Sequence, residues 1–213
     1  RQAPQSAIDF IEKAKKKAKI SSYWDNWYKV YGLGQIGSLQ GVVFSNWKTI
    51  DTIPDDARLL GYGLDFGYSV DPTAIVEVYN WNGKRIVNEV VYRNGLLNSD
   101  IAKYLKDEIV CYADSAEPKS IDELRRYGKT VKGVTKGKDS INYGIQVMQE
   151  QEYLITSNST NLIKELRGYI WDTDKSGTRL NKPFGNDHAI DSLRYHEMET
   201  LGVNKSFGSY SVY

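Results

Sequence analysis

The chain has 213 residues, of which 40% are apolar and 26% are charged, and its formal net charge is +1. This length suits one domain of about 150 residues with flanking segments, and the composition excludes a disordered protein. A dedicated duplex-binding module is usually far more basic, so any contact with DNA must come from local lysine and arginine patches or from metal ions. No run of about 18 apolar residues is present, so no membrane span is predicted.

The first 58 residues are expected to form a helix followed by a linker. Residues 6–19 repeat apolar side chains at helical spacing, and residues 49–58 contain Pro54 and three aspartates. The chain begins at Arg1, without a methionine or a signal peptide, so we expect a fragment of a longer protein. The single cysteine, Cys111, excludes a disulfide within the chain and is expected to be buried.

Residues 59–201 are expected to form the main domain. Alternating apolar residues predict strands at 59–66, 73–79 and 84–92, and Asn82-Gly83 is a strong hairpin signal between the last two. These strands are therefore expected to form an antiparallel three-stranded meander. The tail, residues 202–213, is rich in Gly, Ser and Tyr and is expected to be flexible.

Helices and short strands alternate after the meander. Strands are predicted at 109–113, 130–134 and 153–156, and helices at 99–108, 118–127, 139–151, 160–168 and 186–201. Such alternation is typical of parallel strands joined by helices. The predicted fold class is α/β, with a mixed sheet of the meander plus parallel strands and with helices on both faces.

Asp65 is an acidic residue inside an otherwise apolar predicted strand. A charge there is costly unless it is paired or bound to a cation. Gly63 and Gly67 keep the nearby backbone clear, which we expect to allow close approach by a ligand. The alternative is that Asp65 caps a turn, as aspartate commonly does.

Asp114 directly follows the apolar strand predicted at 109–113. Sites in α/β sheets form beyond the carboxyl ends of strands, which makes Asp114 a second candidate. The alternative is that Asp114 or Ser115 caps the helix that Pro118 opens.

Asp187, His188 and Asp191 open the last predicted helix. Spacings of three and four residues allow their side chains to project from one helix face. An acidic residue in a first turn also favours the helix dipole, which accounts for Asp187 better than for Asp191. A lone histidine is often structural, but the neighbouring carboxylates make His188 a candidate as well.

These aspartates can converge from two strands and one helix face. Carboxylate oxygens suit Mg²⁺ or Mn²⁺, and two such ions about 4 Å apart can clamp the attacking water and the leaving oxygen of a phosphodiester. The ions would also supply the positive charge that a chain of net charge +1 lacks. The pattern therefore predicts metal-dependent phosphodiester hydrolysis.

Other chemistries fit less well. The run Gly133–Ser140 resembles a phosphate-binding loop, but it is one residue short and has Asp139 where Ser or Thr is needed. We expect a loop whose lysines contact DNA rather than an ATP site. One cysteine and two histidines, without CxxC or HExxH spacing, do not match the ligand pattern of a zinc site. No GxSxG elbow is present.

Three motifs in this order resemble the nuclease domain of the large terminase subunits of tailed bacteriophages. They are the runs 63–74, 112–120 and 187–195, and the likeness covers about residues 59–200. The segment 22–47 resembles the part that joins the packaging ATPase to the nuclease in that family, so residues 1–58 would be the end of an ATPase part. The ATPase motifs themselves are absent from this sequence, so this chain alone should not pump DNA.

The resemblance implies an RNase H-like fold and an endonuclease that cuts concatemeric viral double-stranded DNA with little sequence preference. It implies that Asp65, Asp114 and Asp191 bind two Mg²⁺ or Mn²⁺ ions, with His188 beside them. Asp71 and Asp187 are expected as accessory acidic residues of the metal site. It also implies the portal and the small terminase subunit as partners, no membrane, and the host cell cytoplasm as the place of action.

Two other readings stay open at this point. Another RNase H-like nuclease, such as a junction resolvase, would prefer branched DNA. A non-catalytic packaging interaction module would use its aromatic-rich ends to bind a partner and would bind no metal. Arg179, Lys182 and Pro183 precede the last helix and belong either to a DNA-guiding flap or to an ordinary exposed hairpin.

Overall fold

A computed structural model describes residues 41–137, 139–174, 176 and 178–202, together with residues 11–13, 15–16, 18–19, 28–29 and 33. The predicted helix 6–19, the segment 22–47 and the tail 202–213 lie largely outside the described residues. The chain divides into two compact units, residues 46–165 with 187–213 and residues 1–45 with 166–186. The two units are described separately below.

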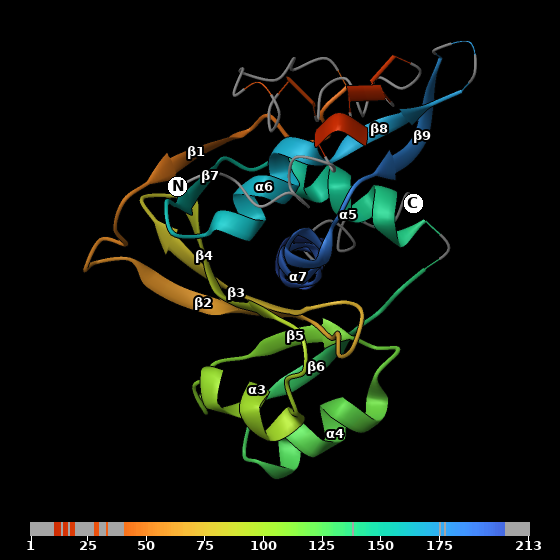
Figure 1. Ribbon diagram of the computed structural model, residues 1–213. Helices are drawn as coiled ribbons and strands as arrows, with labels where there is room; N and C mark the ends of the chain where they lie inside the picture. The colour runs from red at the N-terminus through yellow and green to blue at the C-terminus, as the bar shows by residue number, and fades with distance from the viewer. Residues whose placement is uncertain are drawn as a thin grey trace, which may run out of the picture. The chain divides into compact units, whose positions relative to one another are not determined.

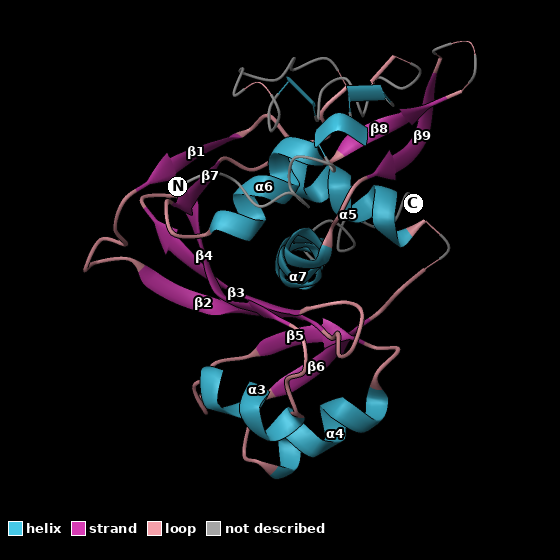
Figure 2. Cartoon of the chain, in the orientation of Figure 1, coloured by secondary structure: helices cyan, strands magenta, loops and turns pink. Residues whose placement is uncertain are grey.

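The described part of the larger unit contains a mixed seven-stranded sheet (Figures 1 and 2). Its strands are β1 (Trp47–Ile50), β2 (Arg58–Asp65), β3 (Thr73–Trp81), β4 (Lys84–Arg93), β5 (Cys111–Asp114), β6 (Val131–Val134) and β7 (Tyr153–Thr156). They lie in the order β1-β7-β4-β3-β2-β5-β6. Strands β2, β3 and β4 pair antiparallel, and the other pairs are parallel, which confirms the predicted meander and mixed sheet.

The turn between β3 and β4 is the one expected from the sequence. Asn82 and Gly83 have φ angles of 51° and 79°, so both occupy the left-handed region that a two-residue hairpin turn requires. This turn fixes the register of two central strands and so contributes to the placement of β2 beside them.

Helices cover both faces of the sheet. They are α3 (Asn98–Tyr104), α4 (Pro118–Arg126), α5 (Ser140–Gln149), α6 (Thr160–Gly168) and α7 (His188–Glu197), which continues as the π-helix η2 (Met198–Gly202). Figures 1 and 2 show α3 and α4 on one side of the sheet and α7 on the other. Buried Ile101 of α3 and Ile121 of α4 share one core cluster with Tyr62 and Leu64 of β2.

The opposite face of β2 carries small residues, so that α7 packs directly on the strand. A Cβ atom added to Gly63 would lie 1.8 Å from the carbonyl oxygen of Ser192, and one added to Gly67 would lie 2.4 Å from that of Asp71. The expectation that these glycines leave room for a ligand is therefore wrong, because the chain itself fills the space. Asp65 lies at the end of this glycine-lined face.

Other boundaries differ from expectation in small ways. Thr49 and Ile50, expected in a linker, belong to β1, a half-exposed four-residue edge strand that pairs with β7. Its short length gives too little alternation to predict a strand from sequence. Cys111 is buried, as expected. Among the described residues, no helix is long and apolar enough to cross a membrane.

The described part of the smaller unit is built around a β-hairpin. Strands β8 (Ile170–Thr173) and β9 (Arg179–Phe184) pair antiparallel, and most of β9 is exposed. The guanidinium of Arg179 lies 4.2 Å from the ring centroid of Trp171. Arg179, Lys182 and Pro183 thus belong to an exposed hairpin.

Candidate active site

Asp65 and His188 contact each other across the interface between β2 and α7. His188 Nδ1 lies 3.2 Å from Asp65 Oδ2, and His188 Nε2 lies 3.8 Å from Asp71 Oδ1. Burial raises the pKa of Asp65, and the charges of Asp191 and Asp114 add to this rise while His188 opposes it. The hydrogen bond to Asp65 raises the pKa of His188. The imidazole is therefore favoured as a cation between two carboxylates.

Asp191, one turn further along α7, is held by Arg194. The guanidinium donates two hydrogen bonds, Nη2 to Oδ2 at 2.6 Å and Nε to Oδ1 at 3.1 Å. The Arg194 side chain is only 2% exposed, and it fits beside Gly144 of α5, where an added Cβ would lie 2.5 Å from the arginine Cγ. The arginine thus compensates a carboxylate charge from within the core.

Asp114 uses its two oxygens differently. Oδ1 accepts a hydrogen bond from the backbone N–H of Ala116 at 2.8 Å. This contact is of the kind that the capping alternative predicted for Asp114. Oδ2 lies 2.6 Å from Lys136 Nζ. Burial alone would raise the pKa of Asp114, but the hydrogen bonds from Lys136 and Ala116 outweigh it and lower the pKa.

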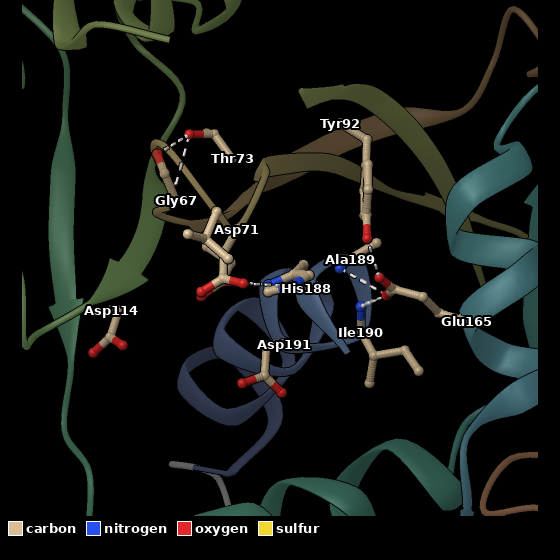
Figure 3. Close-up of polar contacts among 12 residues, drawn as sticks. Gly67, Asp71, Thr73, Tyr92, Asp114, Glu165, His188, Ala189, Ile190 and Asp191 are labelled. Carbon is tan, nitrogen blue, oxygen red and sulfur yellow. Dashed lines mark hydrogen bonds and ion pairs between the residues drawn. The ribbon is translucent and has the colours of Figure 1, made fainter. Parts of the chain in front are cut away.

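The hydroxyl of Tyr195 joins Asp114 to Asp191. It lies 3.4 Å from Oδ2 of Asp114 and 3.4 Å from Oδ2 of Asp191, so one hydroxyl contacts both carboxylates. Figure 3 shows Asp71, Asp114 and Asp191, which come from the loop after β2, from β5 and from α7. The acidic site, defined here as Asp65, Asp114, Asp191 and His188, is thus assembled from β2, β5 and α7.

The two accessory acidic candidates, Asp71 and Asp187, differ in their surroundings. Asp71 is 66% exposed on the loop after β2. Asp187 occupies the N-cap position of α7 without a side-chain capping bond, so capping does not explain its presence. Burial, followed by the charge of Asp191, raises the pKa of Asp187 to about 6.

The sequence did not indicate which residues contact these carboxylates. Lys136, which belongs to the loop expected to contact DNA, pairs with Asp114, because parallel β5 and β6 bring their carboxyl ends together. Arg194 could have been found, since it lies three residues after Asp191 on a helix. Tyr195 follows it, and nothing local in the sequence indicates that its hydroxyl lies between two carboxylates.

By donor type, the acidic site fits a hard divalent cation, because its three carboxylates offer oxygen ligands. Within the described part of the chain, however, no three Asp, Glu, His or Cys side chains are already close enough together to hold an ion. Each carboxylate of the acidic site is instead paired with His188, Arg194 or Lys136. An ion bound here would share these carboxylates with His188 and Arg194 and would compete with Lys136 for Asp114.

Two curated proteins that this chain resembles in sequence are terminase large subunits. The chain is 28% identical over 227 residues to the terminase large subunit of Bacillus phage SPP1, covering 95% of this chain and 52% of that protein. It is 28% identical over 141 residues to the PBSX phage terminase large subunit of Bacillus subtilis strain 168, covering 62% of this chain and 33% of that protein. The chain thus spans at most about half the length of these curated relatives.

A solved structure supports the same relationship. The nuclease domain of the SPP1 large terminase, crystallised with bound Mn, is 26% identical, with a TM-score of 0.62, covering 73% of this chain and 97% of that one. This likeness confirms the RNase H-like fold class. Residues 65–196 match the family described as Terminase RNAseH like domain, and they include the whole acidic site. The chain therefore belongs to the terminase RNase H-like domain family.

Proposed function

We propose that this chain is a metal-dependent endonuclease that cuts concatemeric viral double-stranded DNA during genome packaging. The observation that carries the proposal is the gathering of Asp65, Asp114 and Asp191 from three separate elements around the hydroxyl of Tyr195 and the ring of His188. Membership of a terminase nuclease family and the likeness to a nuclease domain solved with Mn support it.

In this proposal, Asp65, Asp114 and Asp191 hold two Mg²⁺ or Mn²⁺ ions, with Asp71 and Asp187 as accessory acidic residues. When bound, such ions supply an activated water and stabilise the charge on the leaving oxygen of the phosphodiester. His188 orients the Asp65 carboxylate through its Nδ1 contact. Arg194 keeps Asp191 in one rotamer through two hydrogen bonds.

The proposed partners are double-stranded DNA and, by family resemblance, the portal and the small terminase subunit, with the host cell cytoplasm as the place of action. Lys136, whose side chain is partly exposed, lies beside the acidic site and pairs with Asp114. Because the net charge is only +1, we propose that bound ions and such local lysines, rather than a broad basic surface, attract the phosphates.

The test is cleavage of supercoiled plasmid in Mg²⁺, Mn²⁺, Ca²⁺ or EDTA by wild type, Asp65→Ala and Asp114→Ala. Asp122→Ala is the matched control, because Asp122 is an exposed aspartate of α4 that pairs with Arg125. Circular dichroism confirms that each variant is folded. We expect nicking and linearisation with Mg²⁺ or Mn²⁺ by wild type and the control, and none in EDTA or by the two site variants.

Other outcomes would contradict the proposal in different ways. Cleavage that persists in Asp65→Ala and Asp114→Ala would place the chemistry elsewhere. Strong preference for a four-way junction over plasmid would favour a resolvase. No cleavage together with no Mn²⁺ binding by the folded wild type would favour the interaction module.

A further inference from the structure

Glu165 is a buried carboxylate that lies outside the acidic site but contacts the helix that carries it. It belongs to α6 and is 4% exposed. Its Oε2 accepts hydrogen bonds from the backbone N–H groups of Ala189 at 2.8 Å and Ile190 at 3.1 Å. Its Oε1 accepts one from the Tyr92 hydroxyl at 2.8 Å, and Figure 3 shows these contacts. Both carboxylate oxygens are thus engaged.

These bonds satisfy the first turn of α7. The first N–H groups of a helix have no partner within it, and leaving them buried without one is costly. Asp187, at the N-cap position, makes no side-chain capping bond. Glu165, which belongs to another helix, therefore supplies the hydrogen bonds that the N-cap residue Asp187 does not.

The position of this contact along α7 is what links it to the acidic site. Ala189 and Ile190 lie between His188, which contacts Asp65, and Asp191, which faces Asp114 across the Tyr195 hydroxyl. A shift or rotation of the first turn of α7 would move His188 and Asp191 together. Both would then be displaced from Asp65 and Asp114, which are carried by the sheet.

Strand β4 anchors the same contact from the sheet. Glu89 of β4 accepts hydrogen bonds at 2.7 Å from the backbone N–H of Leu162 and from Asn161 Nδ2, which fixes the start of α6. Tyr92 of β4 packs its ring against His188, with centroids 6.2 Å apart and planes at 68°. Thus β4 holds both α6, which carries Glu165, and the imidazole of the acidic site.

We infer that Glu165 is a positioning residue, which with Tyr92 holds the first turn of α7 so that His188 and Asp191 face the carboxylates of the sheet. It acts through Ala189 and Ile190 and does not itself bind an ion, since its oxygens are engaged by the helix and by Tyr92. The consequence for metal binding rests on the proposed function, whereas the consequence for the helix does not.

The experiment compares wild type with Glu165→Leu, which keeps volume and removes the bonds, and Glu165→Gln, whose amide oxygen can still accept both N–H groups. Tyr92→Phe removes only the hydroxyl. Glu77→Ala is the matched control, because Glu77 is a half-buried carboxylate of β3 that accepts bonds from Tyr79 and Asn88 and does not contact α7 through an observed bond. Hydrogen exchange of a peptide covering 187–193 reports helix order, and Mn²⁺ binding is followed by the electron paramagnetic resonance of the free ion.

We expect Glu165→Leu to exchange faster across 187–193 and to need about tenfold more Mn²⁺ for half-saturation, as for other groups that orient metal ligands. Glu165→Gln and Glu77→Ala should bind Mn²⁺ like wild type, and Tyr92→Phe should show a smaller loss in the same direction. If Glu165→Leu does not fold, Tyr92→Phe and Glu165→Gln provide the test.

Three results would overturn the inference. The first is hydrogen exchange across 187–193 in Glu165→Leu at the wild-type rate. The second is Mn²⁺ binding at the wild-type affinity in both Glu165→Leu and Tyr92→Phe. The third is a loss of Mn²⁺ affinity in Glu165→Gln as large as that in Glu165→Leu. The last would mean that the charge matters and not the hydrogen-bond geometry. Wild-type protein that binds no Mn²⁺ would contradict the proposed function, while the exchange measurement judges Glu165 without any ion.

Discussion

His188 Nδ1 lies 3.2 Å from Asp65 Oδ2, although 123 positions separate the two residues in the chain. The contact exists because Gly63, on the same face of β2, lets α7 approach until Ser192 occupies the place of a side chain. The imidazole then reaches the end of the strand. A histidine in this position can orient the carboxylate and compensate its charge, as His188 is proposed to do.

The role of this contact is tested by His188→Ala and His188→Asn. Asparagine can place an N–H near the position of Nδ1, whereas alanine leaves the buried Asp65 without that donor. We expect cleavage by His188→Ala to fall by about 10- to 100-fold and His188→Asn to recover most of the loss. The measurement is the initial rate of plasmid nicking at saturating Mn²⁺. Equal rates in both variants would exclude an orienting role for Nδ1.

Lys136 is expected to compete with a metal ion for Asp114. Lys136→Met removes the ammonium 2.6 Å from the carboxylate and keeps a side chain of similar length. The metal-free variant should lose about 1 kcal/mol of stability or less, because the pair is partly exposed. Mn²⁺ should then raise its melting temperature more than that of wild type, since binding no longer displaces the lysine. Lys132→Met, at an exposed position of β6, is the control. Weaker Mn²⁺ stabilisation in Lys136→Met would contradict the competition.

Gly63→Ala should separate α7 from the sheet. The added methyl would lie 1.8 Å from the backbone oxygen of Ser192, which cannot move without moving the helix. We expect the free energy of unfolding to fall by about 3 kcal/mol, which is the upper end of the usual cost of overpacking a core. Cleavage should also be lost. Gly168→Ala is the control, because a Cβ there meets nothing within 4 Å. Urea unfolding measures both, and equal midpoints would show that the close approach of α7 is not required.

Stability should fall as pH rises through the titration of Glu165. Burial raises the pKa of this carboxyl from 4.5 to about 7 in the folded protein, so it keeps its proton to higher pH when folded than when unfolded. The free energy of unfolding therefore decreases between about pH 4.5 and about pH 7, by about 1.4 kcal/mol per unit of pKa difference. Glu165→Gln cannot ionise, so its curve should be flatter across this range.

Asp187 and His188 also have raised pKa values and act in the same direction, so the comparison with Glu165→Gln is needed to isolate Glu165. Urea unfolding at a series of pH values provides it. Parallel curves for the two proteins would show that Glu165 does not titrate differently in the folded and unfolded chain.

Much of the fold was predictable from local patterns. The Asn82-Gly83 turn requires left-handed backbone at both residues, and the observed φ angles agree. Strand β7 and helix α6 begin and end at the predicted residues, because their apolar periods are clear. Strand β1 was not predicted, since a four-residue edge strand forms through its pairing with β7 rather than through its own alternation.

The acidic site was likewise predictable only in part. Asp65, Asp114 and Asp191 were identified as charges at unusual places, and the structure brings them together with His188. Their ion pairs were not predicted, because the pairing of Asp114 with Lys136 depends on the parallel alignment of β5 and β6. Glu165 was not identified either, since its role depends on a helix end that lies 24 positions away.

The sequence by itself determined which residues carry the unusual charges and which segments form the strands and helices that present them. Both follow from local properties, namely the cost of an acidic residue in an apolar strand and the period of the apolar side chains. Only the tertiary structure decided which cation compensates each carboxylate and what fills the space beside Gly63. Those outcomes depend on distances between segments that are remote in the chain, and electrostatic and steric energies act through distance in space rather than position in sequence.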